Sequence, residues 1–283
     1  MRIKQTILVL SLVFLIGAFS ISMGGCSVDD GDSGTKNENI SATADPEIPT
    51  LEPIIPVKTV VDIESNQITS IEKKEYPYSV KEFNVGQGTY VSSAIRDMPY
   101  NIDGIIGIPE GEGPFPLVLI THGSHSNDNE NLRFDTGYRY LVEELTKQGI
   151  VTVSMNMIKP YIWKYGDNDD GPKSQYLALE QGGYPADFNL EGKIDFDKIA
   201  LVGHSRGGET MFDIANDMEN IGRPVKALLC IAPTYLFDYR DWVSEAKVAL
   251  IVPEYDADVI GLDGISLYDD LEKKVKGEHV AVF

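Results

Sequence analysis

Apolar residues switch between an alternating pattern and a helical period several times after Tyr78, which predicts a succession of strands and helices. Tyr78–Val85, Thr89–Arg96 and Ile102–Ile108 are predicted to be early strands, with a glycine-containing turn between the first two. Phe115–Ile120 is a continuous apolar run, which is typical of a strand buried on both faces of a sheet.

The same order of strand and helix continues to the end of the chain. Helical spacing of apolar residues predicts a helix between Phe134 and Leu145, a short helical piece near Ser174–Gln181, and two later helices over residues 209–220 and 267–275. The further predicted strands are Ile150–Met155, Lys198–Val202, Val225–Ala232, Val248–Pro253 and a last one that begins at Glu278–Phe283. Strands that alternate with helices indicate the α/β class, with a mostly parallel, doubly wound sheet.

The N-terminal residues follow a different pattern. Arg2 and Lys4 precede an apolar run, Ile7–Phe19, which is too short to span a bilayer comfortably, and small residues follow it. This order predicts a signal peptide over residues 1–25. Cys26 follows Met23-Gly24-Gly25 and resembles a bacterial lipobox, so we expect Cys26 to be lipidated; ordinary signal cleavage is the alternative.

Residues 27–57 are rich in Asp, Glu, Ser, Thr, Gly and Pro, and they hold too few large apolar residues to form a core. We therefore predict a flexible linker, and we divide the chain into a signal peptide (residues 1–25), a lipidated cysteine with linker and leading segment (residues 26–77), and one folded domain (residues 78–283). The lipid at Cys26 would anchor this domain at the outer face of a bacterial membrane; free secretion is the alternative.

Composition and charge narrow the possible partners. A chain of 283 residues with 42% hydrophobic content can build one substantial core. A net charge of -20 argues against nucleic acid and other anionic polymers as partners. Only Cys26 and Cys230 are present, and Cys230 lies in an apolar run, so we expect no structural disulfide.

The motif Gly203-His204-Ser205-Arg206-Gly207 follows the predicted strand Lys198–Val202 and precedes a predicted helix. This order is typical of a nucleophile elbow, a sharp turn that exposes a serine hydroxyl. The turn requires residues without side chains near the serine, and Gly203, Gly207 and Gly208 meet that requirement. A glycine-rich turn with an incidental serine is the alternative interpretation.

A serine nucleophile needs a base, usually a histidine oriented by a carboxylate, and two N–H groups that bind the oxyanion. In the elbow, the backbone N–H of Arg206 is the first candidate donor. The second is the N–H of Ser124, in the segment Thr121-His122-Gly123-Ser124 that follows the predicted strand Phe115–Ile120.

These two segments together resemble the α/β-hydrolase superfamily, and within it the bacterial secreted esterases and the chlorophyllase-like and polyester-hydrolase-like groups. The resemblance covers roughly residues 78–283. It implies a sheet of the α/β-hydrolase type and hydrolysis of a small-molecule, lipid or polymer ester by a Ser-His-Asp mechanism. It implies no cofactor and no metal.

In such hydrolases the acid follows the next-but-one strand after the elbow and has an apolar residue three positions later. Asp256, followed by Val259, fits this pattern best, and Asp258 and Glu254 are the competitors. A solvated acidic turn is the alternative, because the whole chain is acidic.

The base is the difficult assignment, because the chain has only 4 histidines. In the family arrangement His122 and His125 lie in the oxyanion loop, and His204 points to neither reactant. His279 comes after the acid, but it lies in the last predicted strand, whereas the base of the superfamily follows that strand. We therefore expect a truncated sequence in which the last strand and helix are incomplete, with His279 as the candidate within it. The competing hypothesis is an inactive surface lipoprotein.

Two weaker signals accompany the elbow. Gly166–Gly171 resembles a calcium loop only loosely, and a polar surface loop is the better interpretation. Aromatic residues cluster after the predicted strands Ile150–Met155 and Val225–Ala232, where they could line a pocket or pack under loops. These aromatic residues are Tyr161, Trp163, Tyr165, Tyr235, Phe237, Tyr239 and Trp242.

Overall fold

The computed structural model describes residues 74–87, 101–124, 132–157, 176, 179–235, 244–253, 256, 259, 261–274 and 279–282. The predicted signal peptide and linker, Cys26, the predicted strand Thr89–Arg96 and the loop Gly166–Gly171 lie outside these residues.

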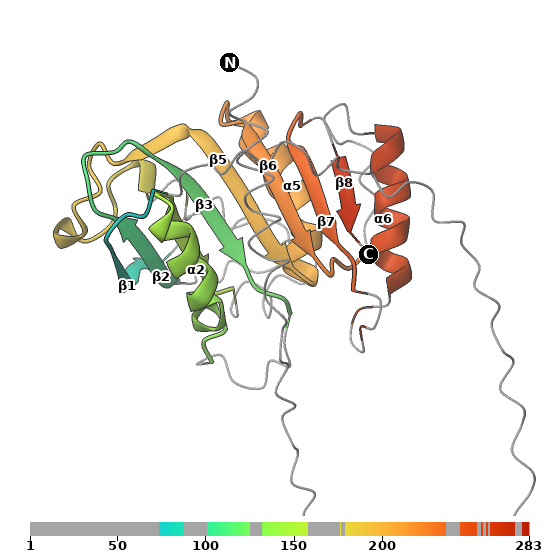
Figure 1. Cartoon of the computed structure of the whole chain (residues 1–283), viewed down its shortest axis with the longest axis horizontal. Helices are drawn as coiled ribbons and strands as arrows, with labels where there is room; N and C mark the ends of the chain where they lie inside the picture. Colours follow the sequence, from blue (N-terminus) through green and yellow to red (C-terminus); the bar gives the residue numbers. More distant parts are fainter. Residues whose placement is uncertain are drawn as a thin grey trace, which may run out of the picture. The chain divides into compact units, whose positions relative to one another are not determined.

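Within the described residues the chain forms an eight-stranded sheet in the order β1-β2-β4-β3-β5-β6-β7-β8 (Figure 1). β1 and β2 pair antiparallel, β2 pairs antiparallel with β4, and the strands from β4 to β8 are parallel to one another. The strands are β1 (Tyr78–Gln87), β2 (Asn101–Pro109), β3 (Phe115–Thr121), β4 (Val151–Met155), β5 (Ile194–His204), β6 (Val225–Ile231), β7 (Lys247–Ile251) and β8 (His279–Val282).

Helices connect the parallel strands. α2 (Arg139–Lys147) follows the 3₁₀ helix η1 (Asp135–Tyr138) and leads to β4, whereas α5 (Arg206–Asn220) leads to β6 and α6 (Gly261–Lys274) leads to β8. The step from β3 to β4 runs along the sheet in the direction opposite to the steps from β5 to β6 and from β7 to β8. Because such crossovers are right-handed, α2 covers one face and α5 and α6 cover the other. A short 3₁₀ helix, η2 (Ala186–Phe188), precedes β5.

The central strands β3, β4 and β5 supply the core. Every residue of β4 is buried, and Leu117, Leu119 and Ile120 of β3 are fully enclosed. Strands buried on both faces are typically apolar runs, as Leu117–Ile120 of β3 and Ile199–Val202 of β5 are, whereas β4 also buries Thr152 and Ser154. The predicted mostly parallel α/β sheet is confirmed.

Several segments differ from their predicted bounds, and three of these differences have a local cause. α5 begins at Arg206 rather than at residue 209, because the elbow turns directly from Ser205 into the helix. β5 begins at Ile194, before its apolar part, because Phe115 and Pro116 of β3 pair with Ile194 and Asp195. The helix predicted from Phe134 begins as the 3₁₀ turn η1 and becomes α-helical at Arg139.

The parallel strands direct their carboxyl ends to one edge of the sheet, where ligands bind in open α/β folds. The elbow follows β5, the Ser124 loop follows β3, and Asp256 comes soon after β7, so all of them lie at this edge. Among the described residues, no helix is long and apolar enough to cross a membrane.

Candidate active site

Ser205 stands in a sharp turn between β5 and α5. Its backbone angles are φ 53 and ψ −124, a conformation that a residue with a side chain rarely adopts. Such strain persists only where the surrounding structure holds it, and it is frequent at active sites. The serine side chain is almost fully enclosed, with 7% of the residue exposed. This is the geometry of a nucleophile elbow.

The glycines on either side of Ser205 are required by close backbone contacts. A Cβ at Gly203 would stand 2.1 Å from the carbonyl oxygen of Gly207, and a Cβ at Gly207 would stand 2.5 Å from that of His122. β5, the start of α5 and the loop after β3 therefore contact one another through backbone atoms, with no side chain between them. A side chain at either position would separate them.

We predict that Gly203→Ala lowers the free energy of unfolding by about 3 kcal/mol, because the new methyl group meets rigid backbone. In a domain of this size that corresponds to a fall in Tm of roughly 6 to 12 °C. Thermal unfolding followed by circular dichroism measures it. Gly137→Ala is the matched control: a Cβ there meets nothing within 4 Å, and we expect a change below about 0.5 kcal/mol. Equal unfolding temperatures for Gly203→Ala and Gly137→Ala would contradict the close backbone contact at Gly203.

The start of α5 provides the first candidate oxyanion donor. Arg206 is the first residue of α5, and the N–H groups in the first turn of a helix are directed toward its N-terminal end, where they can bind an anion. The carbonyl oxygen of Ser205 accepts hydrogen bonds from the N–H groups of Gly208 and Glu209, at 2.9 and 3.2 Å. The positive end of the helix dipole thus lies beside the nucleophile, where it favours a developing negative charge.

The loop after β3 lies against the elbow, as the second donor requires. A Cβ placed on Gly123 would stand 2.9 Å from the Cβ of Ser205 and 3.3 Å from Nδ1 of His204. Ser124, the next residue, is exposed. The structure therefore brings the predicted oxyanion loop and the predicted nucleophile together.

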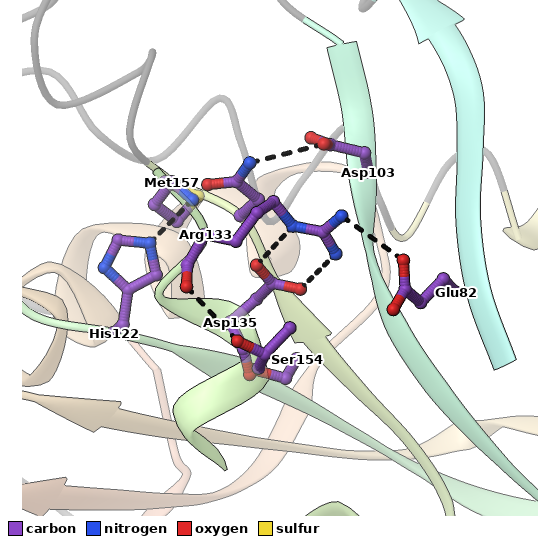
Figure 2. A network of polar contacts seen from close by, with 9 residues as sticks. Glu82, Asp103, His122, Arg133, Asp135, Ser154 and Met157 are labelled. Atoms are coloured by element: carbon purple, nitrogen blue, oxygen red, sulfur yellow. Dashed lines mark hydrogen bonds and ion pairs between the residues drawn. The ribbon is translucent and has the colours of Figure 1, made fainter. Parts of the chain in front are cut away.

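His122 holds this loop in place through hydrogen bonds to backbone groups. The imidazole is fully buried; its Nε2 accepts a hydrogen bond from the backbone N–H of Met157 at 2.9 Å (Figure 2). Its Nδ1 lies 2.7 Å from the carbonyl oxygen of Gly123 and therefore carries the proton and donates it. Because both ring nitrogens hold backbone groups, His122 positions the loop and is unsuited to act as the base.

A second polar network, centred on the buried Asp135 carboxylate, holds the start of η1 against β1 and β4. The Arg133 guanidinium donates two hydrogen bonds to the Asp135 carboxylate, at 2.8 and 2.6 Å, and lies 3.7 Å from Glu82 of β1 (Figure 2). Asp135 is fully buried, and its hydrogen bond raises the pKa of Arg133. Ser154 of β4 donates to the carbonyl oxygen of Asp135 at 2.9 Å.

Sequence reasoning missed this network. The only local signal was an arginine and an aspartate flanking Phe134 at the start of a helical pattern, which by itself is typical of an exposed salt bridge.

Asp256, the favoured acid, is half-buried shortly after β7. Its Oδ1 accepts a hydrogen bond from the backbone N–H of Val259 at 3.0 Å. This bond accounts for the spacing of three between the acid and the apolar residue, because Val259 is buried and fixes the turn that holds the carboxylate. The competitors Asp258 and Glu254 lie outside the described residues.

His279 opens β8, at a distance from the elbow. The sheet register aligns His204 with Ile231, Ile231 with Ile251, and Ile251 with Val282, whereas His279 pairs with Val248. His279 therefore lies about 10 Å short of the level of the elbow along the strands, and about 14 Å across the sheet from β5. The structure does not bring it together with Ser205.

Three further residues that the sequence analysis considered, His204, Tyr235 and Cys230, lie within the described part of the chain. The ring of His204 lies 6.5 Å from that of Tyr138, whose pKa is raised by burial. The Tyr235 hydroxyl donates to Asp270 of α6, so this aromatic residue joins a loop to a helix. The other aromatic residues of the predicted cluster and His125 lie outside the described residues. Cys230 is fully buried, which raises the pKa of its thiol and makes it a poor nucleophile.

The chain is similar to several solved structures. A bacterial heroin esterase has 14% sequence identity and a TM-score of 0.50, over 72% of this chain and 74% of that one. A putative dienelactone hydrolase from Klebsiella pneumoniae has 14% identity and a TM-score of 0.49, over 73% of this chain and 86% of that one. A hyperthermophilic esterase from the archaeon Pyrobaculum calidifontis has 18% identity and a TM-score of 0.48, over 74% and 77%.

No curated protein sequence matches the chain. The family model described as Chlorophyllase matches residues 74–238, which is more than half of the chain and includes both the oxyanion loop and the elbow. With its α/β-hydrolase sheet, the chain therefore belongs to the chlorophyllase family of the α/β-hydrolase superfamily.

Proposed function

We propose that this protein is an extracytoplasmic carboxylic-ester hydrolase in which Ser205 is the nucleophile. The observation that carries the proposal is the strained turn at Ser205, held between β5 and α5 with the Gly123 loop directly against it. Membership of the chlorophyllase family supports ester hydrolysis as the general chemistry.

In this proposal the reaction has two steps. The Ser205 hydroxyl attacks the ester carbonyl while a histidine takes its proton, and the tetrahedral oxyanion accepts hydrogen bonds from the N–H groups of Arg206 and Ser124. The imidazolium returns the proton to the leaving alcohol, which departs and leaves an acyl group on Ser205. Water, deprotonated by the same histidine, then releases the acid and restores the serine.

Asp256 is proposed to orient that histidine. A carboxylate beside the imidazole fixes its tautomer and stabilises the imidazolium that forms when the serine loses its proton. The bond from Val259 to one oxygen of Asp256 holds the carboxylate in place for this role. In this proposal the base lies at the carboxyl edge of the sheet, beside Ser205 and Asp256, and not at the level of His279, which opens β8.

His279 is therefore expected not to be the base. We predict that His279→Gln leaves kcat/KM for a p-nitrophenyl ester within about twofold, whereas loss of a triad histidine costs several powers of ten. The assay uses the full-length protein, with circular dichroism to show that the variant still folds. A fall in kcat of a thousandfold or more at unchanged Tm would assign the base to His279 instead.

The substrate is proposed to be a small-molecule, lipid or polymer ester. The net charge of -20 disfavours polyanionic substrates. The location is proposed from the N-terminal sequence: a lipid at Cys26 and the linker that follows would hold the folded domain at the outer face of a bacterial membrane.

Hydrolysis of p-nitrophenyl esters of increasing acyl length by the full-length protein tests this function. The Ser205→Ala variant defines the rate that does not depend on the nucleophile. Absence of a Ser205-dependent rate with every ester would favour the alternative of an inactive surface lipoprotein.

A further inference from the structure

Glu209 is a fully buried acid one helical turn after the nucleophile. It belongs to the first turn of α5, none of its surface is exposed, and the Thr234 hydroxyl donates a hydrogen bond to its Oε2 at 2.5 Å. Burying a carboxyl group costs free energy unless polar groups surround it, so a buried glutamate at this position needs a structural or functional explanation. The proposed mechanism assigns it no role.

Thr234 lies in the segment that follows β6, residues 232–235, which we call the post-β6 segment. The N–H of Ser205 donates to the carbonyl oxygen of Ile231 at 2.9 Å, just before this segment, and the N–H of Thr234 donates back to the carbonyl oxygen of Ser205 at 3.3 Å. Both backbone groups of Ser205, its N–H and its carbonyl oxygen, are therefore hydrogen-bonded to the chain at or beside the post-β6 segment.

The same segment also reaches the strand that leads to the acid. The N–H of Ala232 donates to the carbonyl oxygen of Ile251, the last residue of β7, at 2.8 Å. Ala232 has a φ of 43, a left-handed conformation that alanine rarely adopts. A backbone strained at this point needs fixed contacts on either side, and the bond between Thr234 and Glu209 is one of them.

We propose that Glu209 is a positioning residue: through the Thr234 hydroxyl it fixes the post-β6 segment, and thereby the backbone of Ser205 relative to the oxyanion donors. This role rests on the proposed ester hydrolysis at Ser205. This role depends on the acceptor oxygen of the Glu209 side chain. It requires a hydrogen-bond acceptor at this position but does not require a negative charge.

Misplacing a nucleophile by a fraction of an ångström slows the chemical step more than it weakens substrate binding. Loss of the Glu209–Thr234 bond therefore lowers kcat and leaves KM nearly unchanged. A residue that served only the stability of α5 would lower the unfolding temperature and leave kcat for each folded molecule intact.

The test compares two pairs of variants in the full-length protein. Glu209→Ala and Thr234→Val remove the bond, whereas Glu209→Gln and Thr234→Ser keep an acceptor and a hydroxyl. We expect the first two to lower kcat by about 10- to 100-fold with KM within about twofold, and the second two to stay within about threefold of the parent. Active sites are counted by titration with a p-nitrophenyl phosphonate, and unfolding is followed by circular dichroism.

Coupling between the two side chains provides an independent readout. If they act through one bond, the double variant Glu209→Ala/Thr234→Val loses no more kcat than the worse single variant. Should Glu209→Ala fail to fold, the comparison of Thr234→Val with Thr234→Ser decides the question. The proposal is overturned if the variants without the bond keep kcat within threefold for each titrated site, or if Glu209→Gln falls as far as Glu209→Ala.

The parent protein and Ser205→Ala are assayed beside these variants. If the parent and Ser205→Ala hydrolyse esters equally well, the proposed function fails and the role of Glu209 with it. If Ser205→Ala alone loses activity, ester hydrolysis stands and only the role of Glu209 is rejected.

Discussion

Replacement of Ser205 by alanine is expected to lower kcat/KM for an aryl ester by about 10⁴-fold or more, because no other group at the elbow can form the acyl intermediate. The proposed oxyanion donors are backbone groups that the variant keeps, so we expect a small rate above the uncatalysed reaction to persist. Alanine adopts the strained φ of 53 about as readily as serine, so we expect the Tm to change little. Initial rates of p-nitrophenolate release from the full-length protein measure the effect.

Ser124→Ala is the matched control for this prediction. It removes a hydroxyl from the same site, but Ser124 is proposed to act through its backbone N–H, which alanine retains. We expect its kcat/KM to stay within about threefold of the parent, since its exposed side chain has no role in the proposed chemistry. A Ser205→Ala variant as active as Ser124→Ala would remove Ser205 from the mechanism.

Asp256→Asn is expected to lower kcat by about 10³- to 10⁴-fold. The amide oxygen can still accept the hydrogen bond from Val259, so we expect the turn to remain, but the negative charge that is proposed to stabilise the imidazolium is lost. The amide also favours the wrong tautomer of the histidine. Rate measurements at saturating ester isolate the effect on kcat from changes in binding.

Asp258→Asn makes the same chemical change two residues away and is expected to alter kcat by less than about threefold, because the proposed mechanism assigns Asp258 no role. The opposite order, with Asp258→Asn the more damaging, would move the acid to Asp258. A similar small effect for both variants would leave the acid to another loop of the same sheet edge.

The sequence was sufficient for those parts of the molecule that depend on short segments. β3 and most of β6 are apolar runs because both of their faces are buried, and such runs can be recognised in the sequence. The elbow was recognisable because a strained serine needs glycines at fixed positions around it.

Contacts whose importance depends on the folded structure could not be recognised in the sequence. The bond between Glu209 and Thr234 joins a helix to a later loop, and the pair of Arg133 and Asp135 becomes significant only because the fold buries the carboxylate. The place of His279 also needed the structure, since only the register of β7 and β8 shows how far it lies from Ser205.

The bare backbone contact at Gly207 has a consequence for how the protein loses its function. A Cβ there would stand 2.5 Å from the carbonyl oxygen of His122 and 2.8 Å from that of Thr121, so the start of α5 lies directly against the end of β3. Because β3 and β5 pair in the sheet, the two proposed oxyanion donors depend on the pairing of these central strands and not on one loop alone. We therefore expect inactivation of the proposed hydrolase by heat or denaturant to coincide with global unfolding.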